Sequence, residues 1–216
     1  MKLLLENWRK YLAEGEMSQA TRLSIFDFDE TIAFTGAYAD AYEAGTPEKE
    51  MTGRNSDKFV KRLHSQEEQD AVKKSGLIDD LAVEIDFRDY NKEVRDPQEV
   101  VNITNLLRQR IADNSSQAMV LTARGADSAP LIQNYLETLT DEEGNPRPIS
   151  AEELIIYGAE GGNKGEIVLS MLEKYRNFKE VEFYDDSKEN IKHMQAAAEK
   201  RPDIRFHIHR VHEGTW

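Results

Sequence analysis

Short apolar runs along the chain are typical of buried β-strands, and amphipathic helical patterns separate them. The five predicted strands are RLSIFDF, QAMVLTA, ELIIYG, EVEFYD and IRFHIHRV. Apolar residues spaced by three or four predict helices in DPQEVVNITNLLRQRIAD, DSAPLIQNYLETL, NKGEIVLSMLEKYRN and SKENIKHMQAAAEK. Because strands and helices alternate, we expect an α/β fold: a parallel sheet of about five strands with helices on both faces.

The segment at about 33–96 lacks this alternation and is too long to be a simple connection between a strand and a helix. A charged helix is predicted around SDKFVKRLHSQEEQDAVKKS, and a strand or extended piece in LAVEIDFRDY. We therefore expect one domain at 19–216 that carries a small insertion after its first strand. An amphipathic helix at 1–18 is predicted to precede this domain.

Composition and charge exclude several classes of protein. No run of eighteen apolar residues exists, so we predict no membrane span and no membrane partner. A formal net charge of −13 argues against a broad basic surface that coats nucleic acid. The chain has no cysteine, which excludes disulfides and thiolate sites and suits a reducing compartment. We therefore expect a cytoplasmic protein.

Polar side chains stand at the carboxyl ends of the predicted strands. They are two acids after the first strand (Asp27, Asp29), Thr122 and Arg124 after the second, Asp185 and Asp186 after the fourth, and Lys164 at the start of the helix after the third. Because these ends meet at one edge of a parallel sheet, where ligands bind, we expect acids, a hydroxyl and a cation in one site.

The chemistry of these residue types favours phosphoryl transfer. Asp27 is a competent nucleophile toward phosphorus and would form an aspartyl-phosphate that water then cleaves. Mg²⁺ held by Asp27 and Asp185 would relieve the repulsion between carboxylate and phosphate. Asp29 would carry a proton to the leaving alcohol and from the attacking water. Thr122 would hydrogen-bond a phosphoryl oxygen, and Lys164 would offset the charge of the crowded carboxylates.

Four short motifs resemble, in the same order, those of the haloacid dehalogenase (HAD) superfamily: DFDET, LTAR, Lys164 in GGNKGE, and YDDS. The resemblance covers about residues 20–212 and implies a Rossmann-like core with magnesium-dependent phosphatase chemistry. It implies the following roles: nucleophile for Asp27, acid and base for Asp29, phosphate and charge partners for Thr122 and Lys164, and a metal-binding set of Asp27, Asp29, Asp185 and Asp186.

The stretches LTARGADSAPLIQNYL and FYDDSKENI are similar to phage-encoded and RNA-repair-associated (Swiss Army Knife-like) members of that superfamily. This similarity implies a phosphomonoester substrate: a nucleotide, a phosphorylated nucleic-acid end or a sugar phosphate. The insertion falls where the family places cap elements that choose substrates. Arg54, Arg88 and Arg124 are therefore the candidate substrate contacts.

Two other kinds of site use residues of these types. Counted from Asp27, positions six and twelve of a calcium loop are Ile32 and Tyr38 in place of glycine and glutamate, which excludes that loop. Gly158 and Lys164 have the separation found in a Walker-type phosphate loop, but the second glycine and the serine or threonine of that motif are absent. An ATP-dependent kinase stays a minor alternative.

The first residues, MKLLLENWRKYLAEGE, resemble the head-targeting peptides of internal proteins of T4-like phages, which a prohead protease removes after Leu-x-Glu. Leu12, Ala13 and Glu14 match that sequence. This resemblance implies the prohead protease as a partner, and a location in the virion interior as well as in the host cytoplasm. The alternative to an enzyme is thus a non-catalytic packaged or partner-binding protein that keeps the fold.

Overall fold

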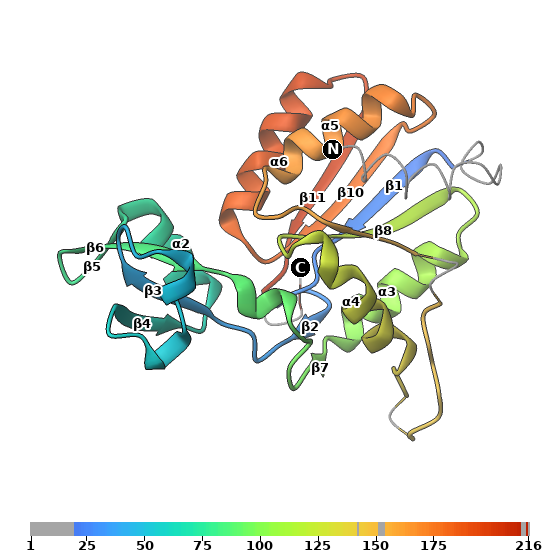
Figure 1. Cartoon of the computed structure of the whole chain (residues 1–216). Coiled ribbons are helices and arrows are strands. Elements are labelled where there is room, and N and C mark those ends of the chain that lie inside the picture. Colours follow the sequence, from blue (N-terminus) through green and yellow to red (C-terminus); the bar gives the residue numbers. More distant parts are fainter. Residues whose placement is uncertain (1–19, 142, 151–153, 213–214, 216) are drawn as a thin grey trace.

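The computed structural model describes residues 20–141, 143–150, 154–212 and 215. The helix predicted at 1–18, with the cleavage sequence in it, lies outside the described residues. A parallel five-stranded sheet with the order β11-β10-β1-β8-β9 forms the centre of the molecule (Figure 1). Its strands are Arg22–Phe26 (β1), Ser116–Thr122 (β8), Ile155–Gly158 (β9), Glu180–Asp185 (β10) and Arg205–Arg210 (β11). The predicted α/β fold is confirmed.

The strand order reverses beside β1. From β1 the chain proceeds to β8 and β9 on one side, and then returns to β10 and β11 on the other side. In open parallel sheets, the carboxyl ends of strands on either side of such a reversal diverge and leave a crevice for a ligand. The acids that follow β1 and β10 therefore lie at the natural ligand-binding edge.

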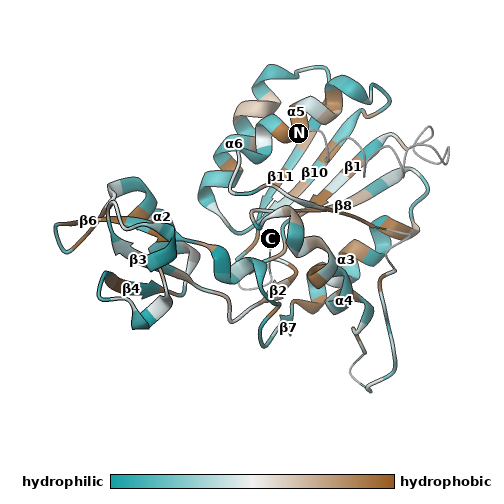
Figure 2. Cartoon of the chain, in the orientation of Figure 1, coloured by the Kyte–Doolittle hydropathy of each residue, from teal (hydrophilic) through white to brown (hydrophobic). Residues whose placement is uncertain are grey.

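Helices cover both faces of this sheet (Figure 1). They are Val101–Ala112 (α3), Ala129–Glu137 (α4), Lys164–Lys174 (α5) and Lys188–Lys200 (α6). Alternate residues of β8 divide between the two sides: Met119 and Leu121 join the apolar cluster of α5 and α6, while Ala118 and Val120 join that of α3 and α4. Because side chains of a strand alternate between its two faces, this period of two decides which residues of β8 contact which pair of helices. Figure 2 shows that the helices carry both hydrophobic and hydrophilic residues.

Helices α5 and α6 pack unusually closely at Gly165. A Cβ atom at this position would lie 2.3 Å from the main-chain oxygen of His193 on α6. Glycine therefore lets the first turn of α5 approach α6, and this turn carries Lys164 at its start.

The insertion forms a lobe of its own beside the sheet (Figure 1). Its antiparallel sheet has the order β4-β3-β6-β5, and one helix, α2, packs on it through Val72. The elements are Ala39–Glu43 (β3), Phe59–Leu63 (β4), Gln66–Ser75 (α2), Leu77–Ile78 (β5) and Leu81–Asp86 (β6). Two short strands, Ala33–Phe34 (β2) and Gln98–Glu99 (β7), pair where the chain leaves and rejoins the core. The described 3-10 turns of the insertion are Glu48–Glu50 (η2), Gly53–Asn55 (η3) and Arg88–Asn91 (η4). A further 3-10 turn, Ala126–Ser128 (η5), lies in the core between β8 and α4.

The helix predicted around SDKFVKRLHSQEEQDAVKKS is only partly correct. Phe59–Leu63 forms strand β4, paired with β3, and the helix begins after Ser65. Ser65 accepts a hydrogen bond from the main-chain N–H of Glu68, which is an N-terminal capping arrangement. The expected strand in LAVEIDFRDY is observed at Leu81–Asp86.

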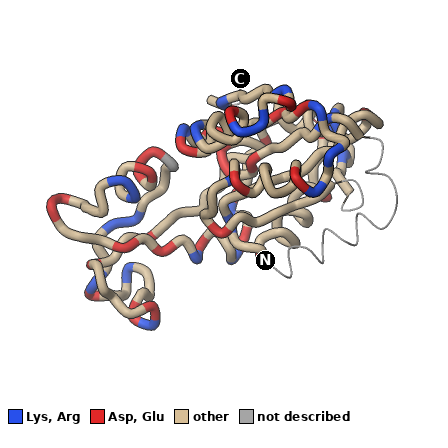
Figure 3. The backbone as a smooth tube through the Cα atoms, turned by 90° about the horizontal axis from the view of Figure 1, so that it is seen from above, with Lys and Arg blue, Asp and Glu red and all other residues tan. Residues whose placement is uncertain are grey.

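Lys and Arg residues alternate with Asp and Glu residues along the described backbone of the core and of the insertion (Figure 3). None of the helices in the described part of the chain is long and apolar enough to span a membrane.

Candidate active site

Three carboxylates gather at the carboxyl ends of β1 and β10. Asp27 follows the last residue of β1, Asp185 ends β10, and Asp186 is the next residue. One oxygen atom of each lies within 4.8 Å of the other two. Asp27 is 6% exposed and Asp185 is fully buried. A set of carboxylate oxygens this close can hold a metal ion. We call these three residues the carboxylate triad.

Lys164 lies behind the triad. As the first residue of α5 it is 1% exposed, and its Nζ donates to Asp27 Oδ1 at 2.5 Å and to Asp185 Oδ2 at 2.8 Å. Asn190 on α6 supports the same group, because its side-chain N–H donates to Asp185 at 3.1 Å. The ammonium of Lys164 is thus enclosed by carboxylates and does not reach the cavity described below. Lys164 therefore does not face this cavity, as the lysine of a Walker-type loop would if a nucleotide phosphate bound there.

The triad carries more negative charge than Lys164 balances. Burial raises the pKa of Asp27; Lys164 opposes this rise, and the charges of Asp185 and Asp29 add to it. Burial and the charges of Asp27 and Asp185 raise the pKa of Asp186 well above its usual range. Burial alone would lower the pKa of Lys164, but the charges of Asp185 and Asp27 prevail and raise it. A bound cation would relieve this repulsion.

Asp29 belongs to a second charged group. Arg124 Nη2 and Nε donate to its two carboxylate oxygens at 2.7 and 2.8 Å, and the Thr35 hydroxyl donates to Oδ1 at 2.7 Å. Arg124 Nη1 donates to the main-chain oxygens of Tyr90 and Glu93, which follow the insertion sheet. This one guanidinium therefore fixes the orientation of Asp29 and ties the insertion to the end of β8.

These contacts bear on two predictions from the sequence. Asp29 is predicted among the metal ligands; its carboxylate is held by Arg124 and is not one of the three grouped carboxylates of the triad. Arg124 was expected to contact substrate, yet its side chain is 1% exposed and all its N–H groups face acceptors within the protein. The cause is the same for both residues, since a bidentate ion pair occupies each partner.

The other predicted site residues form no hydrogen bond or ion pair with the carboxylates of the triad in the described structure. Thr122 ends β8, is fully buried, and accepts the main-chain N–H of Arg124 at 3.2 Å; it does not line the cavity. Arg88 lines the cavity, but its guanidinium is paired with Asp86 at 2.7 Å. Arg54 lines a second cavity of about 480 Å³ within the insertion, which shares Arg88 as a wall.

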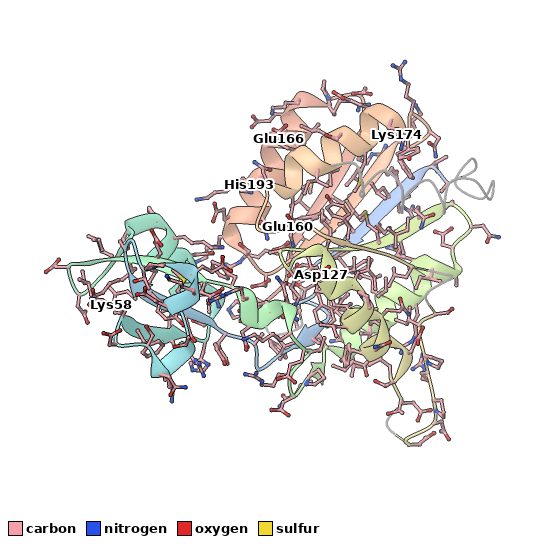
Figure 4. The ribbon with its side chains drawn as sticks, in the orientation of Figure 1. Lys58, Asp127, Glu160, Glu166, Lys174 and His193 are labelled. Carbon is pink, nitrogen blue, oxygen red and sulfur yellow. The ribbon has the colours of Figure 1, made fainter. Side chains whose placement is uncertain are left out.

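A cavity of about 670 Å³ opens over the triad between the insertion and the core. Asp27, Asp29 and Asp186 line it together. Asp127, Glu160 and His193, which Figure 4 labels, are core residues of its wall. The insertion contributes a wall of its own, which includes Lys73, Phe87 and Tyr90. A ligand that fills this cavity therefore touches both parts of the chain.

Sequence reasoning did not single out Lys73, Phe87, Asn190 or His193. For Asn190 and His193 a signal exists, because they follow the end of YDDS by about one and two helical turns, and a spacing of three places them on one side of α6. For Lys73 and Phe87 there is none, since their position depends on how the insertion folds over the core.

Replacing Arg124 by methionine is expected to lower the free energy of unfolding by about 3 kcal/mol, because it leaves the carboxylate of Asp29 without its partner. Chemical denaturation measures the change. Arg205→Met is the matched control: its ion pair with Glu180 is exposed, so we expect a loss below about 1 kcal/mol. Equal losses in the two variants would show that the Asp29–Arg124 pair has no special structural role.

Comparison with known proteins relates the chain to one family. Residues 10–212 match the family described as Protein of unknown function (DUF2608). None of the curated proteins matches the chain significantly. The crystal structure of Legionella pneumophila effector Ceg4, with an N-terminal TEV protease cleavage sequence, shares 17% identity; the match covers 92% of this chain and 89% of that chain, with a TM-score of 0.46. This likeness is too distant to indicate an activity. Because the family match spans nearly the whole sequence, the chain belongs to the DUF2608 family.

Proposed function

We propose that this chain is a magnesium-dependent phosphohydrolase of the haloacid dehalogenase type, which transfers the phosphoryl group of a phosphomonoester to Asp27 and then to water. The observation that carries the proposal is the contact of Lys164 Nζ with both Asp27 and Asp185, with Asp186 completing the triad beside the cavity. Acids with raised pKa values, one buried and one half-buried, that lie together in a cleft are typical of reacting centres.

Asp27 is the nucleophile in this proposal. Lys164 holds its Oδ1, and Oδ2 accepts no hydrogen bond from the described residues. Asp27 also lines the cavity, so a phosphate can approach it from that side. The carboxylate forms a bond to phosphorus while the bond from phosphorus to the alcohol oxygen breaks. Water then attacks the phosphorus and restores the carboxylate.

The triad fits Mg²⁺ as the cofactor. Its donors are carboxylate oxygens, which Mg²⁺ prefers, and described residues supply neither cysteine nor histidine to it. Asp27, Asp185 and Asp186 would hold the ion. When bound, the ion offsets the repulsion between these carboxylates and a phosphate dianion.

Asp29 is the proton carrier. It lines the cavity beside Asp27, and Arg124 and Thr35 hold it in place. In the first step a proton passes from its carboxyl group to the oxygen of the leaving alcohol, and in the second step the carboxylate takes a proton from the attacking water; the protonated oxygen gives up its contact with Arg124. Arg124 acts on this step as a positioning residue, because it orients the carboxylate without touching substrate.

The test is phosphate release from nucleotides, sugar phosphates, oligonucleotides phosphorylated at either end, and p-nitrophenyl phosphate, each with and without Mg²⁺. We expect turnover that depends on the metal. Absence of turnover on every substrate, from protein that binds Mg²⁺ at the triad, would favour the alternative of a non-catalytic protein that keeps the fold.

Affinity for Mg²⁺ is expected to rise with pH. In the metal-free protein the pKa values of Asp27 and Asp186 are raised, so protons compete with the ion and leave when it binds. For the same reason the metal-free protein loses stability as the pH rises above about 4, because these acids bind more protons folded than unfolded. At a concentration of 100 times its dissociation constant, Mg²⁺ is expected to raise the free energy of unfolding by about 2.7 kcal/mol.

Thermal unfolding with and without Mg²⁺, at about pH 6 and about pH 8, measures this effect. Asp185→Asn should lose the stabilisation by the metal. Asp127→Asn is the control, because it removes one charge from the cavity wall outside the triad. Stabilisation that is the same at both pH values, or that survives in Asp185→Asn, would place the ion elsewhere.

A further inference from the structure

The cavity over the triad has three cationic side chains in its wall, and two of them are already paired. Arg124 forms its ion pair with Asp29, and Arg88 with Asp86. Lys73 differs: among the residues that the structure describes, no carboxylate forms an ion pair with it. Its positive charge is therefore available to a ligand.

An aromatic ring lies against this charge. Lys73 lies in the last turn of α2, and its Nζ is 4.7 Å from the centre of the Phe87 ring. Phe87 lines the same cavity and packs against Tyr90, with the ring centres 6.3 Å apart. A cation over an aromatic face keeps its charge and its N–H donors while losing some of its freedom. The ammonium is thus held at the wall that the insertion contributes.

The surroundings make this place selective for an anion. The rest of the cavity wall carries carboxylates, among them Asp127, Glu160 and Glu189 of the core and Asp70, one turn before Lys73 on α2. A negative group of a ligand would be repelled there and attracted at Lys73. The reacting phosphoryl group would bind at the triad, so we expect Lys73 to attract another part of the substrate.

We propose that Lys73, positioned by Phe87, binds an anionic group in the leaving alcohol of the substrate. The preferred substrates are then phosphomonoesters that carry a second negative charge, either a carboxylate or a phosphodiester. This inference rests on the proposed phosphohydrolase function. It makes the insertion responsible for the choice of substrate, through one positive charge in a cavity wall that is otherwise largely acidic.

Two matched pairs of substrates test the inference. Glycerol 3-phosphate and 3-phosphoglycerate differ by a carboxylate, and thymidine 5′-phosphate and the 5′-phosphorylated thymidine dinucleotide differ by a phosphodiester. KM and kcat are measured for the wild-type protein, Lys73→Ala and Lys74→Ala. Lys74 is the control because it is the next residue of α2, is exposed and does not line the cavity.

In Lys73→Ala we expect KM to rise about tenfold for the more highly charged member of at least one pair, with kcat and the other member nearly unchanged. Lys74→Ala should behave as the wild type. The pair that responds identifies the anionic group as carboxylate or phosphodiester. Phe87→Leu, which removes the aromatic face but keeps an apolar side chain, should give a smaller change in the same direction.

Equal changes in KM for both members of each pair would overturn the inference, because Lys73 would then act on the reacting phosphoryl group. No change in either pair would overturn it as well. Both results require that the wild-type protein hydrolyses these esters. A wild-type protein that hydrolyses none of them, nor p-nitrophenyl phosphate, refutes the proposed function itself, so the two failures are distinguishable.

Discussion

Replacing Asp27 by asparagine is expected to reduce metal-dependent phosphate release by about 10⁴-fold or more. The amide has nearly the same size and shape as the carboxylate, and its oxygen still accepts the hydrogen bond from Lys164. It cannot form the phosphoryl intermediate, because it lacks the negative oxygen that attacks phosphorus. The loss is therefore expected in kcat, measured by phosphate release under saturating substrate and Mg²⁺.

Asp127→Asn is the matched control for this variant. It makes the same chemical change in the wall of the same cavity, on an exposed side chain outside the triad (Figure 4). We expect less than a tenfold change in kcat for it. If Asp27→Asn kept a kcat near that of Asp127→Asn, Asp27 would not be the nucleophile and the proposed mechanism would be wrong.

The sheet and the triad could be predicted from the sequence because both depend on local patterns. Each central strand is an apolar run whose end is marked by a polar residue, and the alternation of strands and helices determines the parallel sheet. Parallel strands bring their carboxyl ends to one edge of the sheet. Ser24 of β1 and Glu182 of β10 are paired although they are 158 residues apart in the sequence, and this pairing brings Asp27 and Asp185 together at the ends of the same two strands.

The insertion was harder to predict, because its short antiparallel strands carry a weaker pattern. FVKRL contains apolar residues that fit a helix as well as a strand, and pairing with β3 decides between them. A better signal was present: Ser65 and Glu68 form the S-x-x-E pattern that marks the start of a helix. That pattern places the first turn of α2 after Ser65.

The pairing of Asp29 with Arg124 could not be read from motifs. Both residues stand at strand ends, and the motif alone does not say whether the arginine faces the ligand or a neighbouring carboxylate. The insertion decides this, because its main-chain oxygens at Tyr90 and Glu93 accept from Arg124 Nη1 and turn the other edge of the guanidinium toward Asp29. The spacing of residues within a motif does not predict tertiary contacts of this kind.

Replacing Lys164 by methionine is expected to lower the free energy of unfolding of the metal-free protein by about 3 to 5 kcal/mol near neutral pH. The ammonium is the charge that opposes the repulsion between Asp27 and Asp185, and both carboxylates are buried. Without it, the pKa of Asp27 rises further, because Lys164 is the main influence that lowers it. The folded variant then binds more protons than the unfolded chain over a wider range, so its stability falls more steeply with rising pH than that of the wild type.

Two features of the result would identify this electrostatic cause. The loss should shrink toward about pH 5, where protons replace the missing charge, and Mg²⁺ should recover more stability in Lys164→Met than in the wild type, because the ion meets the same excess of negative charge. Lys174→Met is the control: it changes an exposed lysine at the other end of α5 (Figure 4), and we expect an effect below about 0.5 kcal/mol at every pH. A loss in Lys164→Met that did not depend on pH or Mg²⁺ would instead reflect packing of the aliphatic chain, and the charge balance proposed for the triad would be wrong.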